Sequence, residues 1–219
     1  MSPRRQLPIW QESILLVVTA VVMAVIVKTF FLQAFYIPSE SMEPTMLVDD
    51  KILVQKVSYW TGDVSRGDIV VFDDPGGWLG AEDSKQASNF LQRGLELVGL
   101  FPTGGHLIKR VIGVGGDTVE CCDDQGRLIV NGKAIDEPYV LDPSLTAERT
   151  FDVKVPKGYL WVMGDNRGNS SDSRFHMGDP GGGFISEDTV VGKAWLRVWP
   201  WNRAGFIHDP DSFDTLDKP

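Results

Sequence analysis

Residues 14–27 read ILLVVTAVVMAVIV, the most apolar stretch of the chain, and none of them is charged. Extended to Leu32, this stretch would form a helix about 28 Å long, close to the ~30 Å hydrocarbon core of a bilayer. A cleaved signal peptide would end in a small-x-small site, whereas the residues here, FFLQAFYIP (30–38), are bulky. A buried core helix would be shorter or amphipathic. The sequence therefore predicts a transmembrane helix over residues 13–33.

The flanking charges indicate how this predicted span is oriented. The pair Arg4–Arg5 precedes it, and after Lys28, near its far end, no Lys or Arg occurs before Lys51. Cationic residues favour the cytoplasmic side of a membrane. We therefore expect a plasma-membrane protein that crosses the bilayer once. Its N-terminus (1–12) would be cytoplasmic, and its main domain (34–207) would be extracytoplasmic.

Composition and charge limit the classes of partner. Of the 219 residues, 42% are apolar and 23% are charged, which suits a globular domain with a core. The net charge is −9 and no Lys or Arg cluster is longer than two, so nucleic acid is not an expected partner. His106, His176 and His208 are scattered, and we expect no metal site and no cofactor. The last residues, HDPDSFDTLDKP (208–219), predict an acidic, disordered tail.

From residue 47 onward, short runs rich in β-branched and aromatic residues are separated by turn residues. The clearest runs are 51–57, 68–72, 107–114, 117–122, 127–131, 159–164 and 191–199. VNGK (130–133) predicts a tight two-residue hairpin. Residues 82–98 carry helical spacing, and 76–80 and 178–183 are glycine-rich loops. The expected fold class is therefore mainly β, an antiparallel β-sheet domain behind a transmembrane helix.

Two short features leave alternatives open. Cys121 and Cys122 are adjacent, which excludes a CxxC redox or zinc pattern and leaves a strained vicinal disulfide as their only pairing within the chain. The interpretation we favour is two small strand side chains on opposite faces of a sheet. In VWPWN (198–202), Trp199 and Trp201 either pack in the core or contact the lipid interface.

Residues 35–46, FYIPSESMEPTM, follow the predicted span and place two serines one residue apart. A nucleophilic serine needs a base, and none of the three histidines lies in a recognisable triad context. A lysine can replace histidine when burial lowers its pKa far below the free value of ~10.4. Lys109 in LIKRVIGV meets this condition, since Leu107 and Val111 share its face of a predicted strand. The candidate nucleophile and base are therefore Ser41 and Lys109.

Four segments resemble, in this order, the four blocks of bacterial type I signal peptidases: IPSESMEPT (37–45), RGDIVVF (66–72), IKRVIGVGGD (108–117) and GDNRGNSSDSR (164–174). The segment VKTFFLQAFYIPSESM (27–42) also resembles the junction of anchor and catalytic domain in that family. The resemblance covers about residues 13 to 200. Four ordered blocks behind an apolar span are far more specific than two serines alone, and they favour a catalytic serine over a polar turn.

The resemblance implies that Ser41 is the nucleophile and Lys109 the general base. Ser39 would complete an oxyanion hole with the Ser41 backbone N–H. One departure is Glu40, because the family often has Gly between its two serines. We expect Ser39 and Ser41 to share a face of an extended segment, so that Glu40 points away from the developing negative charge. The insertion at 76–100 lies outside the blocks and is assigned no role.

The same resemblance implies a supporting network around the two candidate residues. Ser170 matches the serine that hydrogen-bonds to the lysine and orients it. Asp172 matches the acidic residue that supports this network, and we expect it to act through Arg174. Arg110 is the basic residue beside the lysine, and we expect Asp165, in the turn of the fourth block, to pair with it.

The resemblance further implies a membrane-anchored serine endopeptidase that cleaves N-terminal signal peptides from secreted preproteins. Cleavage would follow a small residue at an A-x-A site and would proceed through an acyl-enzyme. The expected partners are preproteins, the lipid bilayer and, nearby, the translocation machinery. Two alternatives fit less well. A self-cleaving repressor-type protease would carry a DNA-binding module in place of the span, and a silent peptide-binding β-domain would lack Ser41 or Lys109.

Overall fold

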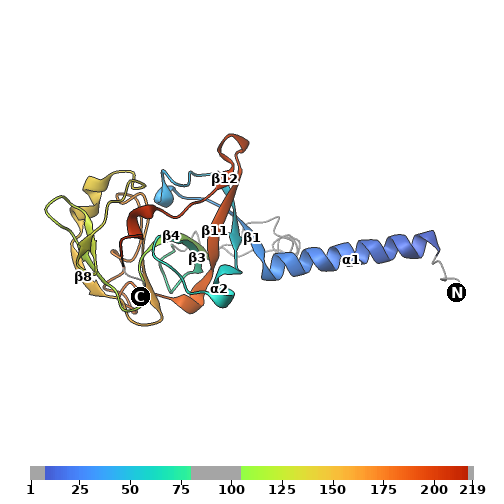
Figure 1. Cartoon of the computed structure of the whole chain (residues 1–219), viewed down its shortest axis with the longest axis horizontal. Coiled ribbons are helices and arrows are strands. Elements are labelled where there is room, and N and C mark those ends of the chain that lie inside the picture. Colours follow the sequence, from blue (N-terminus) through green and yellow to red (C-terminus); the bar gives the residue numbers. More distant parts are fainter. Residues whose placement is uncertain (1–7, 80–104, 217–219) are drawn as a thin grey trace.

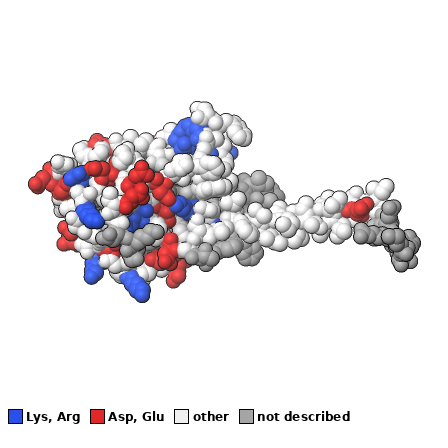
Figure 2. Space-filling view, viewed as in Figure 1, with Lys and Arg blue, Asp and Glu red and all other residues white. Residues whose placement is uncertain are grey.

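The protein consists of one long N-terminal helix and a β-rich body, as the computed structural model shows (Figure 1). The structure describes residues 8–79 and 105–216. Helix α1 (Ile9–Phe30) extends away from the β body. Its segment Ile9–Val27 is long and apolar enough to cross a membrane, and none of it is buried inside the protein. Figure 2 shows that α1 presents few charges, whereas acidic and basic side chains gather on the β body.

Helix α1 begins earlier than the predicted span 13–33 and gives way sooner to strand β1 (Leu32–Tyr36). Strand β1 pairs in antiparallel register with β2 (Lys51–Gln55), and the Lys56 N–H donates to the Phe31 carbonyl. The backbone groups that follow the helix are therefore satisfied by a neighbouring strand. That partner lies far along the chain, so the apolar run alone does not reveal where the helix ends.

The main sheet of the β body has eight strands and is antiparallel at every pairing. Its order is β1-β2-β11-β3-β4-β9-β10, with β12 paired to β11, so that β4 lies well inside the sheet. The remaining strands of this sheet are β3 (Ile69–Asp73), β4 (His106–Gly113), β9 (Tyr159–Met163), β10 (Ile185–Ser186), β11 (Val190–Trp199) and β12 (Gly205–Phe206).

A smaller antiparallel sheet has the order β7-β6-β5-β8. Its strands are β5 (Thr118–Cys121), β6 (Leu128–Val130), β7 (Lys133–Ala134) and β8 (Phe151–Lys154). Between β6 and β7 the chain turns at Asn131 and Gly132, whose φ angles of 52° and 77° are the left-handed values that a two-residue hairpin requires. Val130 pairs with Lys133, so the predicted tight hairpin is confirmed.

The predicted strand runs agree with the structure, since each of them contains a strand, and the mainly β, antiparallel fold class is confirmed. The prediction missed β1, β8, β10 and β12. Strand β1 continues from the apolar run without a turn signal, and β10 and β12 are each 2 residues long. The helical spacing at 82–98 lies outside the described residues.

The short helical elements are α2 (Ser58–Thr61), η1 (Glu40–Met42), η2 (Pro143–Glu148), η3 (Glu187–Thr189), η4 (Trp201–Arg203) and η5 (Asp211–Phe213).

Strand β4 joins the apolar clusters of the β body. Every residue from Leu107 to Gly113 is buried. Leu107 and Val111 belong to one cluster, Ile112 to a second and Ile108 to a third. A strand buried on both faces is expected to be apolar throughout, yet β4 carries Lys109 and Arg110 at its centre. These two cations are therefore the first sign of a site.

The C-terminal segment is ordered where the structure describes it, so the expectation of a disordered tail is wrong for residues 208–216. Phe213 and Leu216 are buried in the same apolar cluster as Ile112. Asp209 also accepts a hydrogen bond from Lys193 Nζ at 2.5 Å. The acidic composition of the segment masked the effect of these two apolar residues. A terminal segment becomes ordered when such residues are buried against the rest of the protein.

The adjacent cysteines are joined by a disulfide, so the favoured interpretation of two side chains on opposite faces of a strand is wrong. Strand β5 ends at Cys121, and the peptide bond between Cys121 and Cys122 is cis. Side chains alternate between faces only within a strand, and Cys122 lies beyond its end. The bond is the vicinal one that the sequence left as the only pairing within the chain.

Candidate active site

Ser41 lies in the turn η1, which follows an extended Ser39 and is held by buried methionines. Met42 and Met46 are fully buried in the cluster that includes Ile52 of β2. The Met46 N–H donates to the Met42 carbonyl and closes the turn. Two apolar anchors after the serine therefore fix the position of a residue that is itself 7% exposed.

Lys109 approaches Ser41 from the centre of β4. Its Nζ lies 2.8 Å from Ser41 Oγ, within hydrogen-bonding distance. The residue is 4% exposed and pairs across strands with Val70 of β3. The structure thus brings together the two residues that the sequence analysis proposed as nucleophile and base, although 68 positions separate them along the chain.

The environment of Lys109 favours the neutral amine. Burial lowers the pKa of Lys109 from 10.5 to about 8, and the nearby Arg174 guanidinium acts in the same direction. The carboxylates of Asp172 and Asp165 oppose this change without cancelling it. A lysine with such a pKa is partly neutral near physiological pH, and a neutral amine can accept a proton from a hydroxyl.

Ser39 and Glu40 take different directions at the start of η1. Ser39 Oγ lies 3.3 Å from Ser41 Oγ, so the two hydroxyls face one another. The Glu40 carboxylate accepts a hydrogen bond of 2.9 Å from Asn169 Nδ2 at the surface. The expected extended segment is not found, because Glu40 begins a 3-10 turn. The carboxylate is nevertheless held away from Ser41, by its partner Asn169 rather than by strand alternation.

Arg110 and Asp165 form the ion pair that the sequence analysis expected. Two bonds join them, Nε to Oδ1 at 2.9 Å and Nη2 to Oδ2 at 2.7 Å, and both side chains are buried. A third donor of Arg110, Nη1, reaches the Gly67 carbonyl at 2.8 Å. Thr45 Oγ1 donates to Asp165 at 2.5 Å. This pair therefore ties the segment after Ser41 to the turn after β9.

Asp172 and Arg174 form a second buried pair, again as expected. Arg174 Nε and Nη2 donate to the two carboxylate oxygens of Asp172, both at 2.9 Å. The Gly164 N–H also donates to this carboxylate at 3.0 Å. Burial alone would raise the pKa of Asp172, but these bonds and the charge of Arg174 outweigh it and lower that pKa. Asp172 therefore stays ionised near Lys109.

Ser170 is brought to the site, but its expected hydrogen bond to Lys109 is not found. It is 5% exposed, and its Oγ makes no full hydrogen bond within the described residues, but it lies close enough to Asp172 to help lower the pKa of that carboxyl. The hydroxyl packs against Gly164, where a Cβ would overlap both Ser170 Oγ and the Ser41 carbonyl oxygen. Glycine is therefore required at 164 by close approach, and the role of Ser170 toward the lysine stays a prediction.

Several contacts at the site carried no clear signal in the sequence. The Asn166 N–H donates to the Ser41 carbonyl at 3.1 Å, and Asn166 Nδ2 donates to the Glu40 carbonyl at 3.2 Å. Asn166 belongs to the fourth block, so the sequence indicated that it lies near the site but not that it binds the backbone of Ser41 and Glu40. Glu137 and Tyr139, which contact the basic residues of the site, lie outside all four blocks. Only the folded structure identifies them.

In the described part of the chain, the hydrogen-bond partners of Ser41 Oγ are Ser39 and Lys109 and include no histidine. His176 Nε2 lies 2.9 Å from Ser171 Oγ, and its Nδ1 lies 2.6 Å from Asp179. Its ring stacks on Trp78, with 4.3 Å between the ring centroids. These contacts hold the loop that follows Arg174 and do not supply a base to Ser41.

A small pocket opens between the nucleophile segment and β4. Its volume is about 30 Å³, room for roughly one small group. Its walls come from β1 and the residues after it, from β3 and from β4: Phe35, Tyr36, Ile37, Pro38, Val71, His106, Leu107 and Ile108. Two of its lining residues, Pro38 and Ile108, directly precede Ser39 and Lys109 along the chain.

Comparison with known proteins identifies the family of the chain. The family model described as signal peptidase, peptidase S26, matches residues 10–199. A probable signal peptidase I of Mycobacterium leprae (strain TN) is 37% identical, over 96% of this chain and 83% of that protein. A probable signal peptidase I-2 of Synechocystis sp. is 38% identical, over 95% of this chain and 82% of that protein. A crystal structure of a signal peptidase I from Enterococcus faecalis V583 matches 60% of this chain and 96% of that chain, with 27% identity and a TM-score of 0.38.

A buried contact between Ser41 and Lys109 on an antiparallel β body suits a serine-type peptidase, and the family match covers nearly the whole chain. The chain belongs to the signal peptidase family, peptidase S26, and is an enzyme of the serine peptidase class.

We predict that Gly164→Ala lowers kcat/KM roughly 10²-fold, because its Cβ would overlap the Ser41 carbonyl and displace the nucleophile. The matched control is Gly178→Ala, since a Cβ there meets nothing within 4 Å. Both variants would be assayed as purified full-length protein on a synthetic preprotein. Equal activity of the two variants would contradict the close approach at 164.

Proposed function

We propose that this chain removes N-terminal signal peptides from secreted preproteins through a catalytic dyad of Ser41 and Lys109. The observation that carries the proposal is the 2.8 Å contact between Lys109 Nζ and Ser41 Oγ, made by a lysine that is 4% exposed. The family supplies the class of substrate. The geometry and the lowered pKa of Lys109 support the division of roles.

In the acylation step, Ser41 Oγ attacks the carbonyl carbon of the scissile peptide bond. Neutral Lys109 Nζ takes the hydroxyl proton, and the carbonyl oxygen becomes an oxyanion. The intermediate then collapses, and the C–N bond breaks. The Lys109 ammonium gives its proton to the departing amine of the mature protein. The signal peptide remains as an ester on Ser41.

In the deacylation step, the same lysine activates water. Neutral Lys109 takes a proton from a water molecule, whose oxygen attacks the ester carbonyl of the acyl-enzyme. The second tetrahedral intermediate releases Ser41 Oγ, which recovers its proton from the lysine. One residue therefore serves as base and acid in both steps, and this requires a pKa close to the working pH.

Ser39 Oγ and the Ser41 N–H are proposed to stabilise the oxyanion. One such donor contributes roughly 2.7–4 kcal/mol of transition-state stabilisation. The assignment of Ser39 is supported by its 3.3 Å approach to Ser41 Oγ. It is also supported by Glu40, whose carboxylate is bound by Asn169 and so does not oppose the developing charge.

The buried ion pairs are proposed to support the dyad without touching the substrate. Arg110 with Asp165, and Asp172 with Arg174, hold the loop and strand ends that surround Lys109. We also propose that Ser170 orients the lysine. Its buried hydroxyl lies against Gly164 and close to Asp172, and Asp172 in turn acts on Lys109 through its charge.

Cleavage after a small residue is supported by the small pocket whose lining includes Pro38 and Ile108, the residues before Ser39 and Lys109. The volume of this pocket, about 30 Å³, suits a small group such as a methyl. The lining is mostly apolar, with Ile37, Val71 and Ile108. An Ala side chain near the cut, as in an A-x-A site, suits such a pocket.

Membrane anchoring through α1 is proposed, with the N-terminus cytoplasmic and the β body outside. The length and apolar surface of α1 support a span, and the charge asymmetry supports this direction. A preprotein carries its own apolar segment in the same bilayer. Shared anchoring raises the effective concentration of substrate at the membrane face, and it would bring the enzyme close to the translocation machinery.

An aromatic group on the surface is proposed to contact the lipid interface. Trp199, Trp201 and Phe206 are 44%, 78% and 58% exposed, so core packing does not account for them. They flank the hairpin between β11 and β12, which stands near the end of the β body from which α1 extends (Figure 1). Trp and other aromatic side chains favour this position at membrane surfaces.

We predict that Ser41→Ala and Lys109→Ala each abolish cleavage of a purified secretory preprotein, because attack and proton transfer form one event. For the same reason, the double variant is expected to be hardly worse than either single variant. The measurement is single-turnover cleavage by the full chain in detergent. Losses that multiply in the double variant would contradict a dyad.

We predict that kcat/KM rises with pH through an apparent pKa near 8, since only the neutral form of Lys109 is a base. Below that pKa, activity is expected to fall about tenfold per pH unit, and Lys109→Arg is expected to be inactive because guanidinium stays protonated. The control replaces His106, His176 and His208 together by Ala. An acid limb that this control moves by one pH unit or more would assign the base to a histidine.

We predict that lipids brominated near the headgroup quench Trp201 fluorescence in the full chain reconstituted into vesicles. Trp201→Phe is then expected to remove a larger share of the quenchable signal than Trp78→Phe, since Trp78 is buried at 8% exposure. Equal shares for the two variants would show that the aromatic group does not reach the bilayer.

A further inference from the structure

Glu137 lies outside the four sequence blocks, yet its carboxylate is buried against the active-site loop. Arg167 Nη1 and Nη2 donate to Glu137 Oε2 and Oε1 at 3.0 and 2.8 Å. The side chains of the pair are 0% and 7% exposed. Tyr139 Oη donates to the same carboxylate at 2.5 Å. One acidic side chain from the segment after β7 therefore accepts hydrogen bonds from three donors.

Arg167 links Glu137 to the backbone of the loop that contacts Ser41. Its Nε donates to the Gly164 carbonyl at 2.9 Å, and its own carbonyl accepts from Arg174 Nη2 at 2.9 Å. Arg167 thus braces the turn that contains Asn166, whose N–H donates to the Ser41 carbonyl at 3.1 Å. A displacement of Arg167 would move the turn against which Ser41 rests.

A second route leads from Glu137 to the other cation of the site. The Tyr139 ring lies under the Arg110 guanidinium, with 4.1 Å from the guanidinium carbon to the ring centroid. Arg110 in turn makes the two-bond pair with Asp165. The hydrogen bond to Glu137 fixes the position of the Tyr139 hydroxyl, and with it the ring. Both routes end on the residues that surround the Ser41–Lys109 contact.

We propose that Glu137 is a positioning residue for the catalytic dyad, acting mainly through Arg167 on the Ser41 backbone. The inference rests on the proposed Ser/Lys mechanism. Glu137 touches neither reacting group, and its effect is geometric. A buried guanidinium that loses its counter-charge must seek water or another acceptor, and Arg167 would then leave the Gly164 carbonyl.

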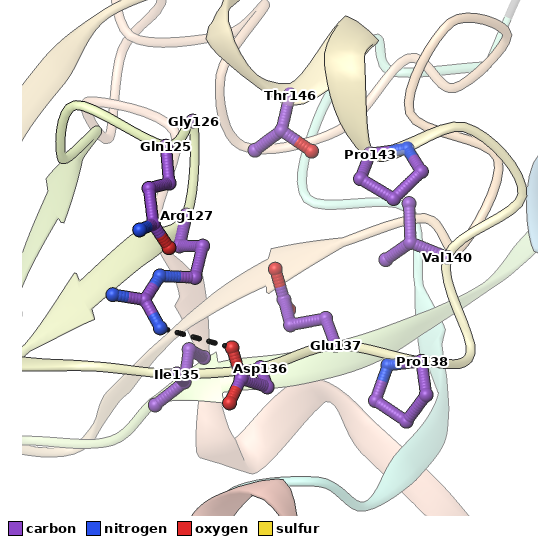
Figure 3. A pocket seen from close by; sticks show the side chains of 10 residues that line it. All are labelled: Gln125, Gly126, Arg127, Ile135, Asp136, Glu137, Pro138, Val140, Pro143 and Thr146. Carbon is purple, nitrogen blue, oxygen red and sulfur yellow. Dashed lines mark hydrogen bonds and ion pairs between the residues drawn. The ribbon is translucent and has the colours of Figure 1, made fainter.

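The surroundings of Glu137 provide a matched control. It borders a pocket of about 340 Å³, shown in Figure 3, together with Thr146, a further partner of Arg167 at 3.3 Å. The adjacent Asp136 lines the same pocket, but it pairs with Arg127 at 3.0 Å and its side chain is 83% exposed. Replacing either carboxylate by a neutral amide changes the net charge by the same amount. Only the replacement of Glu137 removes a partner of Arg167 in the active-site loop.

The experiment compares Glu137→Gln with Asp136→Asn in the full chain, purified in mild detergent. The amide keeps the size of the carboxylate but can serve only one donor of Arg167 well. We expect kcat on a synthetic preprotein to fall roughly 10- to 100-fold in Glu137→Gln, as for a small misplacement of a reacting group. KM is expected to stay within about twofold, and Asp136→Asn is expected to match the wild type.

Hydrogen exchange gives a reading that does not depend on activity. The peptide over residues 165–169 contains the Asn166 amide that is bonded to Ser41. We expect its exchange to become about tenfold faster in Glu137→Gln, while the amides of β4 keep their protection. If Glu137→Gln does not fold, Glu137→Asp, which keeps the charge on a shorter side chain, takes its place under the same criteria.

Three results would overturn the proposal. The first is a kcat for Glu137→Gln equal to that of Asp136→Asn. The second is a lower kcat with unchanged exchange at 165–169. The third is faster exchange throughout the β body, which would mean a purely stabilising role. If Ser41→Ala retains activity, the dyad itself fails. If Ser41→Ala is inactive while Glu137→Gln behaves as wild type, only the role of Glu137 fails.

Discussion

The burial of one lysine in the middle of a β-strand is the constraint on which the rest of this structure depends. Strand β4 contributes to three apolar clusters, and Lys109 is buried at its centre. Taking an ammonium out of water disfavours its charged form, so the same packing that stabilises the sheet lowers the pKa of Lys109 to about 8. The core and the base are therefore products of one arrangement, and neither can be altered without the other.

The ion pairs around the lysine follow from the same constraint. Arg110, Arg167 and Arg174 are each almost fully buried, and each is matched to a carboxylate by two hydrogen bonds. Buried charges are tolerated only in such pairs, since an unpaired one is costly. The pairs also join distant segments, because Asp165 is shared with Thr45 and Glu137 with Tyr139. A shell of paired charges thus surrounds a lysine that forms no ion pair with any of the residues that the structure describes.

Much of the fold followed from local patterns, whereas two errors arose from contacts that are distant along the chain. Runs of β-branched residues became strands, and Asn131-Gly132 became a hairpin, because these signals act over a few neighbouring residues. The end of α1 was misjudged because β2 supplies the hydrogen bonds that follow it. The C-terminal segment was predicted to be disordered because its acidic composition outweighed the two apolar residues, Phe213 and Leu216, that are buried in the structure. Both of these errors concern residues whose partners lie elsewhere in the chain.

The sequence by itself determined that the chain has an apolar helix and a mainly β fold. It also singled out Ser41, Lys109 and the charged residues that pair beside them as candidates for the site, since they lie in the four ordered blocks. Only the tertiary structure decided that Ser41 and Lys109 touch, that Glu40 is bound by Asn169, and that Glu137 stands behind Arg167. The physical reason is that spacing along a chain specifies which face of a strand or turn a side chain occupies. It does not specify which distant side chain meets it, because that depends on how the two sheets and their connecting loops pack together.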